Sequence, residues 1–374
     1  MGIPHPCYTE IGVARYRSFR DADWSLLATA LIISALGVLQ IYSATHGTKF
    51  QDAWWKQILW VTLGVGLLWL FTSIDYHTLL AQIPLLYTLA LGSLVAVLVV
   101  GRLVFGSRRW IRVFGINFQI SEFVKLVIIL LVAKYLSELK RDGVGIRDLL
   151  KLGVLVVIPA ALVVVQPDLG TGLTYLPVLA AGVLMAGLPW RHVAVIVLAG
   201  ALVLPVGWLF LKDYQKARLV TFLDPSRDPR GAGYQVIQSK IAVGDGGMWG
   251  RGVTRGTQTQ LRFLPVPHTD FIFSAFAEEH GFVGVVVVLG LYFLLLMQIV
   301  QNAQMAPDRA GMYICMGVAA LLLFHVLVNA GMVVGSMPVT GIPLPLMSSG
   351  GSNTFSVFMM LGLVNNVRLR RFAA

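Results

Sequence analysis

The sequence predicts an all-α integral membrane protein, a polytopic bundle of about ten transmembrane helices forming a single domain over residues 1–374. The composition is 57% hydrophobic and only 13% charged, well below the charged content of a soluble domain, and the mean hydropathy is +0.77. Several apolar runs reach the roughly 20 residues that a helix needs to cross a bilayer. No run has the alternating pattern of a membrane β-barrel, so we expect the spans to be helical.

The predicted spans follow one another along the whole chain. In order they are Trp24–Ala44, Trp54–Ser73, Leu79–Val100, Phe123–Leu139, Leu152–Val165, Gly170–Gly187, His192–Leu211, Phe271–Val300, Met312–Val334 and Asn353–Val367. The fifth and tenth are short enough to be broken or tilted. The first run has spanning length and no small-residue cleavage site follows it, so we do not expect a cleaved signal peptide. Cys7 and Cys315 fall in a tail and a helix, which argues against a disulfide.

Basic residues in the short loops predict the orientation. With ten helices, those before the first helix, between helices four and five, and after the last helix all fall on one side, and this side is cytoplasmic by the positive-inside rule. We therefore expect cytoplasmic tails at 1–23 and 368–374. Residues 212–270 then form a large extracytoplasmic loop between helices seven and eight.

That loop is basic, with nine Lys or Arg against five Asp. Long loops cross the membrane regardless of charge, which is one explanation. The other is a basic outer surface, including Arg218, that attracts a phosphate-bearing substrate. Nucleic acid is not an expected partner, because no nucleic-acid module interrupts the helices and the loop faces outward.

The most informative stretch is His268-Thr269-Asp270-Phe271, where the loop meets a long apolar helix. A carboxylate at this border is expensive to desolvate and is therefore a functional candidate, with His268 beside it. The alternative is that Asp270 is simply the N-cap of the next helix. Two further acids, Glu278 and Glu279, lie about two turns into that helix, so at least one should face the protein interior or a wet cavity.

The loop between helices three and four carries a second candidate set. Ser121 is a candidate N-cap, Glu122 suits the first turn of the helix, and Lys125 can pair with Glu122 at i, i+3. The pair could line a cavity, or Glu122 could be a cap while Lys125 reaches to the interface. Trp110 suits the belt of aromatic residues at the membrane–water interface, and Arg109 could bind a phosphate through two hydrogen bonds.

Three glycine- and proline-rich segments remain. Asp168, in Gln166–Thr171, either caps helix six or joins Glu122, Lys125 and Asp270 in a central polar cluster. The segment 242–252 is not a Walker A loop and reads better as a flexible turn-rich loop than as an anion cradle. Residues 338–352, which include Ser349, suit non-helical backbone lining a cavity. Common hydrolase and metalloprotease spacings are absent from the sequence.

Taken together, these segments resemble the SEDS family (shape, elongation, division and sporulation). The resemblance runs nearly the full length and rests on segments in family order: GSRRWI at 106–111, SEFVKL at 121–126, QPDLGT at 166–171, GYQVIQS at 233–239, HTDFIF at 268–273 and PVTGIPLPLMSSGGS at 338–352. Two segments depart from the family pattern. Val266 and Pro267 replace a Glu-Gln pair, which removes an acid near Asp270, and Asp245 replaces a serine.

The resemblance implies a multi-pass peptidoglycan glycosyltransferase of the bacterial cytoplasmic membrane that polymerises lipid II on its outer face for cell elongation and rod shape. It implies Asp270 as the catalytic residue and general base in that chemistry, with Glu122 and Lys125 in the central cavity and Trp110 at the R-W motif. The remaining substrate-binding candidates are Arg109, Asp168, Arg218, His268 and Ser349.

It also implies a class B penicillin-binding protein as transpeptidase partner, within a larger elongation complex and surrounded by membrane lipids. We expect no definite cofactor; a divalent cation such as Mg or Mn is compatible with the carboxylates, although no definite metal ligand set is visible. Two other functions fit the same residues: a flippase or transporter for a lipid-linked precursor, and a non-catalytic scaffold for a partner enzyme.

Overall fold

The computed structural model describes residues 21–371 apart from 105–106, 114–115, 140–143, 196–197, 199–208, 210–212 and 229–230. The first 20 residues of the predicted cytoplasmic tail, most of the predicted helix His192–Leu211 and the last three residues lie outside these ranges. A total of ten helices therefore stays a prediction.

The other nine predicted spans are helical. Their helices are α1 (Trp24–Thr45), α2 (Ala53–Ser73), α3 (Tyr76–Ala81) with α4 (Ile83–Val100), α5 (Ile120–Ser137), α6 (Ile146–Val165), α7 (Leu169–Leu173) with α8 (Tyr175–Met185), α13 (Ile272–Gln304), α14 (Arg309–Val333) and α15 (Gly351–Leu369). Two predicted spans are each divided into a short and a long helix, and the fifth is longer than predicted.

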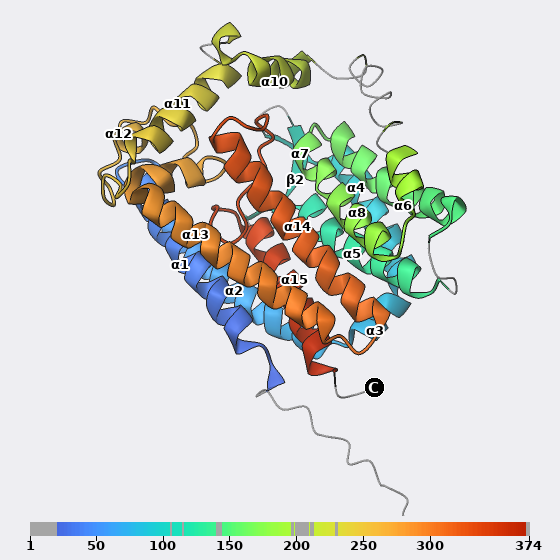
Figure 1. Cartoon of the computed structure of the whole chain (residues 1–374). Helices are drawn as coiled ribbons and strands as arrows, with labels where there is room; N and C mark the ends of the chain where they lie inside the picture. Colours follow the sequence, from blue (N-terminus) through green and yellow to red (C-terminus); the bar gives the residue numbers. More distant parts are fainter. Residues whose placement is uncertain are drawn as a thin grey trace, which may run out of the picture.

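The membrane-protein class is confirmed. Among the described residues, five helices are long and apolar enough to span a bilayer, namely α1, α2, α6, α13 and α14. Figure 1 shows α1, α2, α13, α14 and α15 running side by side, with α4, α5, α6 and α8 against them. The most enclosed of the five is α14, which packs against α5, α8, α13 and α15. It is the central helix from which the site is built.

A three-stranded antiparallel sheet joins α4 to α5, which the all-helical prediction did not include. Its strands are β1 (Arg102–Val104), β2 (Ser107–Val113) and β3 (Ile116–Gln119), in the order β1-β2-β3. Trp110 pairs with Gln119 across β2 and β3, and this register delivers the chain directly to the start of α5. The β-branched residues of these three strands favour β structure, but each strand is too short to be recognised in the sequence beside the long apolar spans.

Most of the predicted large loop is itself helical. It contains α10 (Asp213–Leu223), the 3₁₀ turn η2 (Pro225–Arg227), α11 (Ala232–Asp245) and α12 (Thr257–Gln260). In Figure 1 these elements lie at one end of the bundle, while the beginning of α1 and the end of α15 lie at the other. At that second end Arg368 forms an ion pair with Asp23 at 2.8 Å, so the two ends of the described chain are close.

The glycine-rich segment is not a free loop, which corrects the sequence-based interpretation. Helix α13 is broken at Gly281, whose φ of 65° lies in the left-handed region. The N–H groups of Phe282 and Val283 donate to the carbonyls of Gly247 and Met248 at 2.8 and 3.1 Å. Backbone polar groups freed by a break in a membrane helix need partners, and the glycine-rich segment supplies them.

Candidate functional site

The backbone before Asp270 is held by the segment 338–350. The N–H of Ser349 donates to the carbonyl of His268 at 3.0 Å. Ser348 Oγ donates to the next carbonyl, that of Thr269, at 2.8 Å. The segment 338–350 is non-helical, as predicted, and most of its residues from 342 to 348 are buried. Two stretches far apart in sequence therefore form one structural unit.

The carboxylate of Asp270 does not cap a helix. Helix α13 begins at Ile272, and its N-cap is Phe271 with no side-chain cap bond. The alternative reading of Asp270 as an ordinary cap is therefore wrong. Its Oδ2 lies close to Gly341, because a Cβ built there would approach this oxygen to 3.5 Å. A Cβ there would be in ordinary van der Waals contact with the carboxylate, and the φ of 73° at Gly341 lies in the left-handed region that favours glycine.

The electrostatic environment of Asp270 contains opposing contributions. Burial raises the pKa of the Asp270 carboxyl above its usual value, and the positive charges of Arg109 and Arg218 act against this rise. The negative charge of Asp168 acts in the same direction as burial. The carboxylate is thus partly enclosed, close to two predicted phosphate ligands, and poised to accept a proton more readily than a solvated aspartate.

Asp168 caps the start of the sixth predicted span and its charge acts on Asp270, but none of its contacts joins it to Glu122 or Lys125. Its Oδ1 accepts from the N–H of Thr171 at 3.2 Å and so caps α7. Its Oδ2 accepts from Gln119 Nε2 at 2.7 Å and pairs with Arg109 at 3.2 Å. Asp168 is 5% exposed and Arg109 about a third exposed, so the pair joins the protein interior to an open surface.

Arg218 reaches the site from the predicted extracytoplasmic loop. It lies in α10, and its Nη1 donates to the carbonyl of Val339 at 3.1 Å. Val339 belongs to the segment 338–350 that also holds the loop before Asp270. A hydrogen bond to this segment therefore helps to place a basic residue of the loop near Asp270.

Glu122 and Lys125 form an ion pair of 2.7 Å inside the protein, where they are 3% and 1% exposed. Lys125 therefore does not reach to the interface. Ser121 is not the N-cap, because α5 begins one residue earlier, after Gln119. Lys125 Nζ also contacts His325 Nε2 at 3.3 Å. His325 Nδ1 in turn lies 3.1 Å from the carbonyl oxygen of Pro343, so His325 links the pair to the segment 338–350.

Sequence reasoning missed His325 and Asn329, which lie one turn apart on α14. His325 joins the Glu122–Lys125 pair to the segment 338–350. Asn329 Nδ2 donates to the carbonyls of Asp270 and Ile342 at 3.0 and 2.9 Å. Both are polar residues within an apolar span, and that signal alone could have identified them as candidates.

Two of the remaining predicted ligands, His268 and Ser349, lie at the same segment, and Trp110 follows Arg109 in β2. His268 stacks on Phe50 with ring centroids 5.2 Å apart, and burial lowers the pKa of His268. Trp110 is half-buried in β2, and Ser349 is half-buried beside His268. The structure thus brings the predicted residues to one end of the bundle, although Glu122 and Lys125 lie deeper than the rest.

Several buried polar atoms of this region have no hydrogen-bond partner within the described part of the chain. They are Arg109 Nε, Glu122 Oε2, Asn329 Oδ1 and Thr340 Oγ1. Buried polar groups are normally satisfied by protein, water or ligand. The orphan atoms belong to residues that surround or support Asp270, which fits a site designed for a polar ligand.

Glu278 and Glu279 are both buried, as the prediction of at least one inward-facing acid requires. Glu278 accepts from the N–H groups of Gln258 and Thr259 at 2.6 and 3.1 Å, and so holds α12. Glu279 accepts from Ser43 Oγ and from Gln40 Nε2. Glu278 thus fastens the loop to α13, Glu279 joins α13 to α1, and neither is placed beside Asp270 by these contacts.

The described residues contain no group of three or more His, Cys, Asp or Glu side chains arranged to hold a metal ion. Asp168 is also occupied by Arg109, Gln119 and Thr171. The side chains described around Asp270 therefore do not form a site that could hold a divalent cation through protein ligands alone. The predicted compatibility with Mg or Mn finds no support in this geometry.

Comparison with known proteins gives a consistent result. A family profile described as "Cell cycle protein" (FTSW_RODA_SPOVE) matches residues 23–372. The chain is 34% identical to "Peptidoglycan glycosyltransferase RodA" of Treponema pallidum, over 96% of this chain and 100% of that protein. It is 37% identical to "Peptidoglycan glycosyltransferase MrdB" of Escherichia coli K12, over 93% of this chain and 94% of that protein.

Two solved structures share the fold. One, from work titled "Structural coordination of polymerization and crosslinking by a peptidoglycan synthase complex", aligns with a TM-score of 0.82 at 38% identity, covering 94% of this chain and 99% of the other. The Thermus thermophilus rod shape determining protein RodA aligns with a TM-score of 0.70 at 32% identity, covering 94% and 98%. The similarity therefore covers nearly the whole of each chain.

Proposed function

Because the chain belongs to the FtsW, RodA and SpoVE family of cell cycle proteins, we propose that it is a peptidoglycan glycosyltransferase that polymerises lipid II. The observation that carries the proposal is the partly buried Asp270 carboxylate, fixed by backbone bonds to its loop and flanked by the charges of Arg109 and Arg218. Among the curated relatives, those with glycosyltransferase names match over nearly their full length.

The reaction joins an acceptor sugar hydroxyl to the anomeric carbon of a lipid-pyrophosphate donor. The new carbon–oxygen bond forms as the bond from that carbon to the pyrophosphate breaks, and the leaving pyrophosphate keeps the electron pair. Asp270 takes the hydroxyl proton as general base, a role that its raised pKa assists. The guanidinium groups of Arg109 and Arg218 stabilise the negative charge on the pyrophosphate.

The remaining polar residues hold the site together. The Glu122–Lys125 pair contacts His325, and His325 contacts the segment 338–350, so these three residues support that segment from inside the bundle. Asp168 orients Arg109 by their ion pair, so its role is to position a phosphate ligand. Trp110, His268 and Ser349 line the approach to Asp270 and contact the sugars or the pyrophosphate.

We place this site on the outer face of the bacterial cytoplasmic membrane, with residues 212–270 as the extracytoplasmic loop and both tails in the cytoplasm. The positive-inside pattern supports this orientation. A class B penicillin-binding protein is the proposed transpeptidase partner, with other elongation-complex proteins. The structural relative from a synthase complex supports such a partner.

The test is polymerisation of labelled lipid II by the purified chain, with and without the transpeptidase partner. Asp270→Asn should lower the rate by about 100-fold or more, the usual contribution of a general base. The matched control is Asp52→Asn, which changes an exposed carboxylate at the same end of the bundle that makes no side-chain cap bond.

Near-normal glycan synthesis by the Asp270→Asn protein would refute the assignment. Transfer of the lipid-linked precursor across vesicles without polymerisation would favour a transporter instead. Activity that depends only on the active site of the partner would favour a scaffold.

A further inference from the structure

A hollow in the surface lies far from Asp270. It has a volume of about 610 Å³ and is formed by α3, the end of α5 and the beginning of α14. From Arg309 to Asn329 along α14 the rise is about 30 Å, at 1.5 Å per residue, which equals the thickness of the hydrocarbon core. The hollow therefore lies at the opposite membrane surface, at the depth of lipid headgroups.

The lining of the hollow has an apolar part and a charged part. The apolar part comes from small or aliphatic side chains of α3 and α14, and the polar part contains both signs of charge. The residues are Leu80, Ala81, Ala310, Ser137, His77, Lys134, Glu138, Asp308 and Arg309.

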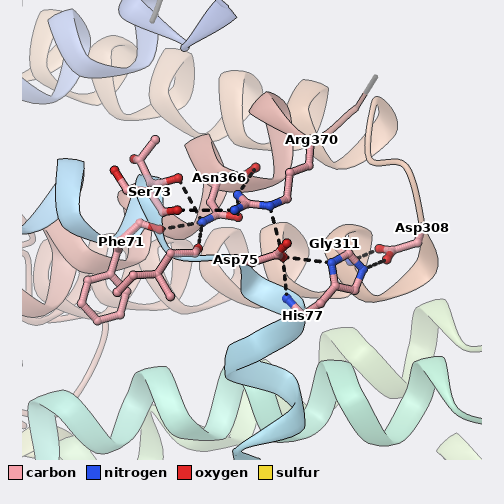
Figure 2. A network of polar contacts seen from close by, with 10 residues as sticks. Phe71, Ser73, Asp75, His77, Asp308, Gly311, Asn366 and Arg370 are labelled. Carbon is pink, nitrogen blue, oxygen red and sulfur yellow. Dashed lines mark hydrogen bonds and ion pairs between the residues drawn. The ribbon is translucent and has the colours of Figure 1, made fainter. Parts of the chain in front are cut away.

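One wall is fixed by a network of charged groups. His77 Nδ1 lies 3.0 Å from Asp75, and its Nε2 lies 2.7 Å from Asp308 (Figure 2). Asp308 Oδ1 also accepts from the N–H of Gly311 at 2.7 Å, and Asp75 pairs with Arg370 at 3.1 Å. His77 and Asp308 are thus engaged with protein partners and form a wall, so the ligand must be recognised by other groups.

Three lining charges are available to a ligand. The guanidinium of Arg309 is exposed and forms no hydrogen bond or ion pair within the described residues. Lys134 and Glu138 are 4.0 Å apart and 25% and 67% exposed. An exposed pair of this kind contributes little stability, so a ligand can replace it at small cost.

We propose that this hollow binds the headgroup of a zwitterionic phospholipid that carries a phosphate and a primary ammonium group. The phosphate is held by Arg309, which can fork onto two oxygens, and by Lys134. The ammonium lies against Glu138, and Leu80 and Ala81 cover the glycerol region. A purely anionic headgroup would leave Glu138 beside negative charge, so the mixed lining favours the zwitterion. The proposal is independent of the chemistry at Asp270.

The test uses the full-length chain, stripped of lipid in detergent and then given phosphatidylethanolamine and phosphatidylglycerol at equal concentration. Native mass spectrometry measures how much of each lipid stays bound. We expect phosphatidylethanolamine to be retained at least about fivefold better, and Arg309→Gln to reduce its retention about tenfold. Arg147→Gln is the matched control, because Arg147 is exposed on the same membrane side, at the start of α6, and does not line the hollow.

Glu138→Gln is a second variant at a well-exposed position, where unfolding is not expected, and it should remove the preference for phosphatidylethanolamine. Equal retention of both lipids by the unaltered chain, or equal losses in Arg309→Gln and Arg147→Gln, would overturn the proposal. Displacement of bound lipid by soluble glycerophosphoethanolamine at the same concentration would assign the hollow to a free cytosolic headgroup and also overturn the lipid assignment.

Discussion

The side-chain amide of Asn329 donates to the backbone carbonyl of Asp270 at 3.0 Å. The same nitrogen donates to the carbonyl of Ile342 at 2.9 Å. One buried residue of the central helix thus sets the distance between the loop of Asp270 and the segment 338–350. Since Gly341 in that segment lies against the Asp270 carboxylate, Asn329 controls the shape of the site without touching substrate.

Asn329→Ala should therefore impair polymerisation. The change leaves two buried carbonyls without their donor, at a cost of about 1–3 kcal/mol each. We expect the rate on lipid II to fall about tenfold to 100-fold, while the chain still folds. Initial-rate assays and thermal melting in detergent measure the two effects. The control is Asn353→Ala, since Asn353 is also buried but neither side-chain polar atom has a hydrogen-bond partner among the described residues.

The pH dependence of polymerisation should report on Asp270. Its pKa is raised by burial and opposed by Arg109 and Arg218, and the base must be ionised to act. Activity is then present above this pKa and lost as the pH falls through it. Arg218→Gln removes an opposing cation, so the pKa rises further and the acidic limb of the rate profile moves to higher pH. Arg255→Gln, an exposed change in the same loop, should leave the limb in place.

The same shift predicts a stability effect of defined sign. A carboxyl whose pKa is raised on folding binds its proton more tightly in the folded state, so its ionisation lowers the free energy of unfolding as the pH rises. At neutral pH, Asp270→Asn should therefore melt at the same temperature as the unaltered chain or higher. A clearly lower melting temperature would mean that the carboxylate stabilises the fold, contrary to this argument.

The ion pair inside the bundle gives a different kind of prediction. Lys125→Met leaves Glu122 buried without its cation, and breaking a buried pair in this way costs about 3–5 kcal/mol. The double change Glu122→Gln with Lys125→Met should recover most of the lost stability, because no uncompensated charge remains. If the double variant melts as low as Lys125→Met alone, the pair is not the source of the loss.

How far the sequence could predict this molecule depends on the type of signal. Long apolar runs predict most spans to within a few residues, as α1 and α14 illustrate, because spanning length is set by the bilayer. Asp270 is detectable from sequence since a carboxylate at a membrane border is costly. His325 and Asn329 were missed because their roles depend on which face of α14 meets the segment 338–350, and periodicity in a uniformly apolar helix does not reveal this.

The break in α13 depends on tertiary contacts in the same way. Gly281 has a positive φ, and a Cβ at this position would approach Gly250 N to 2.3 Å and the backbone of Met248 to 2.7 Å. In Gly281→Ala, the alanine at position 281 would therefore have an unfavourable φ. Its Cβ would also clash with backbone atoms of Gly250 and Met248, which cannot move aside as a flexible side chain could. We expect a loss of more than about 2 kcal/mol, combining the cost of an unfavourable φ with that of overpacking.

The consequences should extend beyond stability, because the break is where the glycine-rich segment joins the bundle. The N–H groups of Arg251 and Gly252 donate to carbonyls of Glu278 and Glu279 at 3.0 and 2.9 Å, so separation of the segment also loosens the loop that leads to Asp270. Limited proteolysis should cut near residues 246–256 faster in Gly281→Ala. Gly290→Ala, in the same helix with open space around its Cβ, should change neither melting nor proteolysis. Equal behaviour of the two variants would show that α13 can close its break without losing the loop.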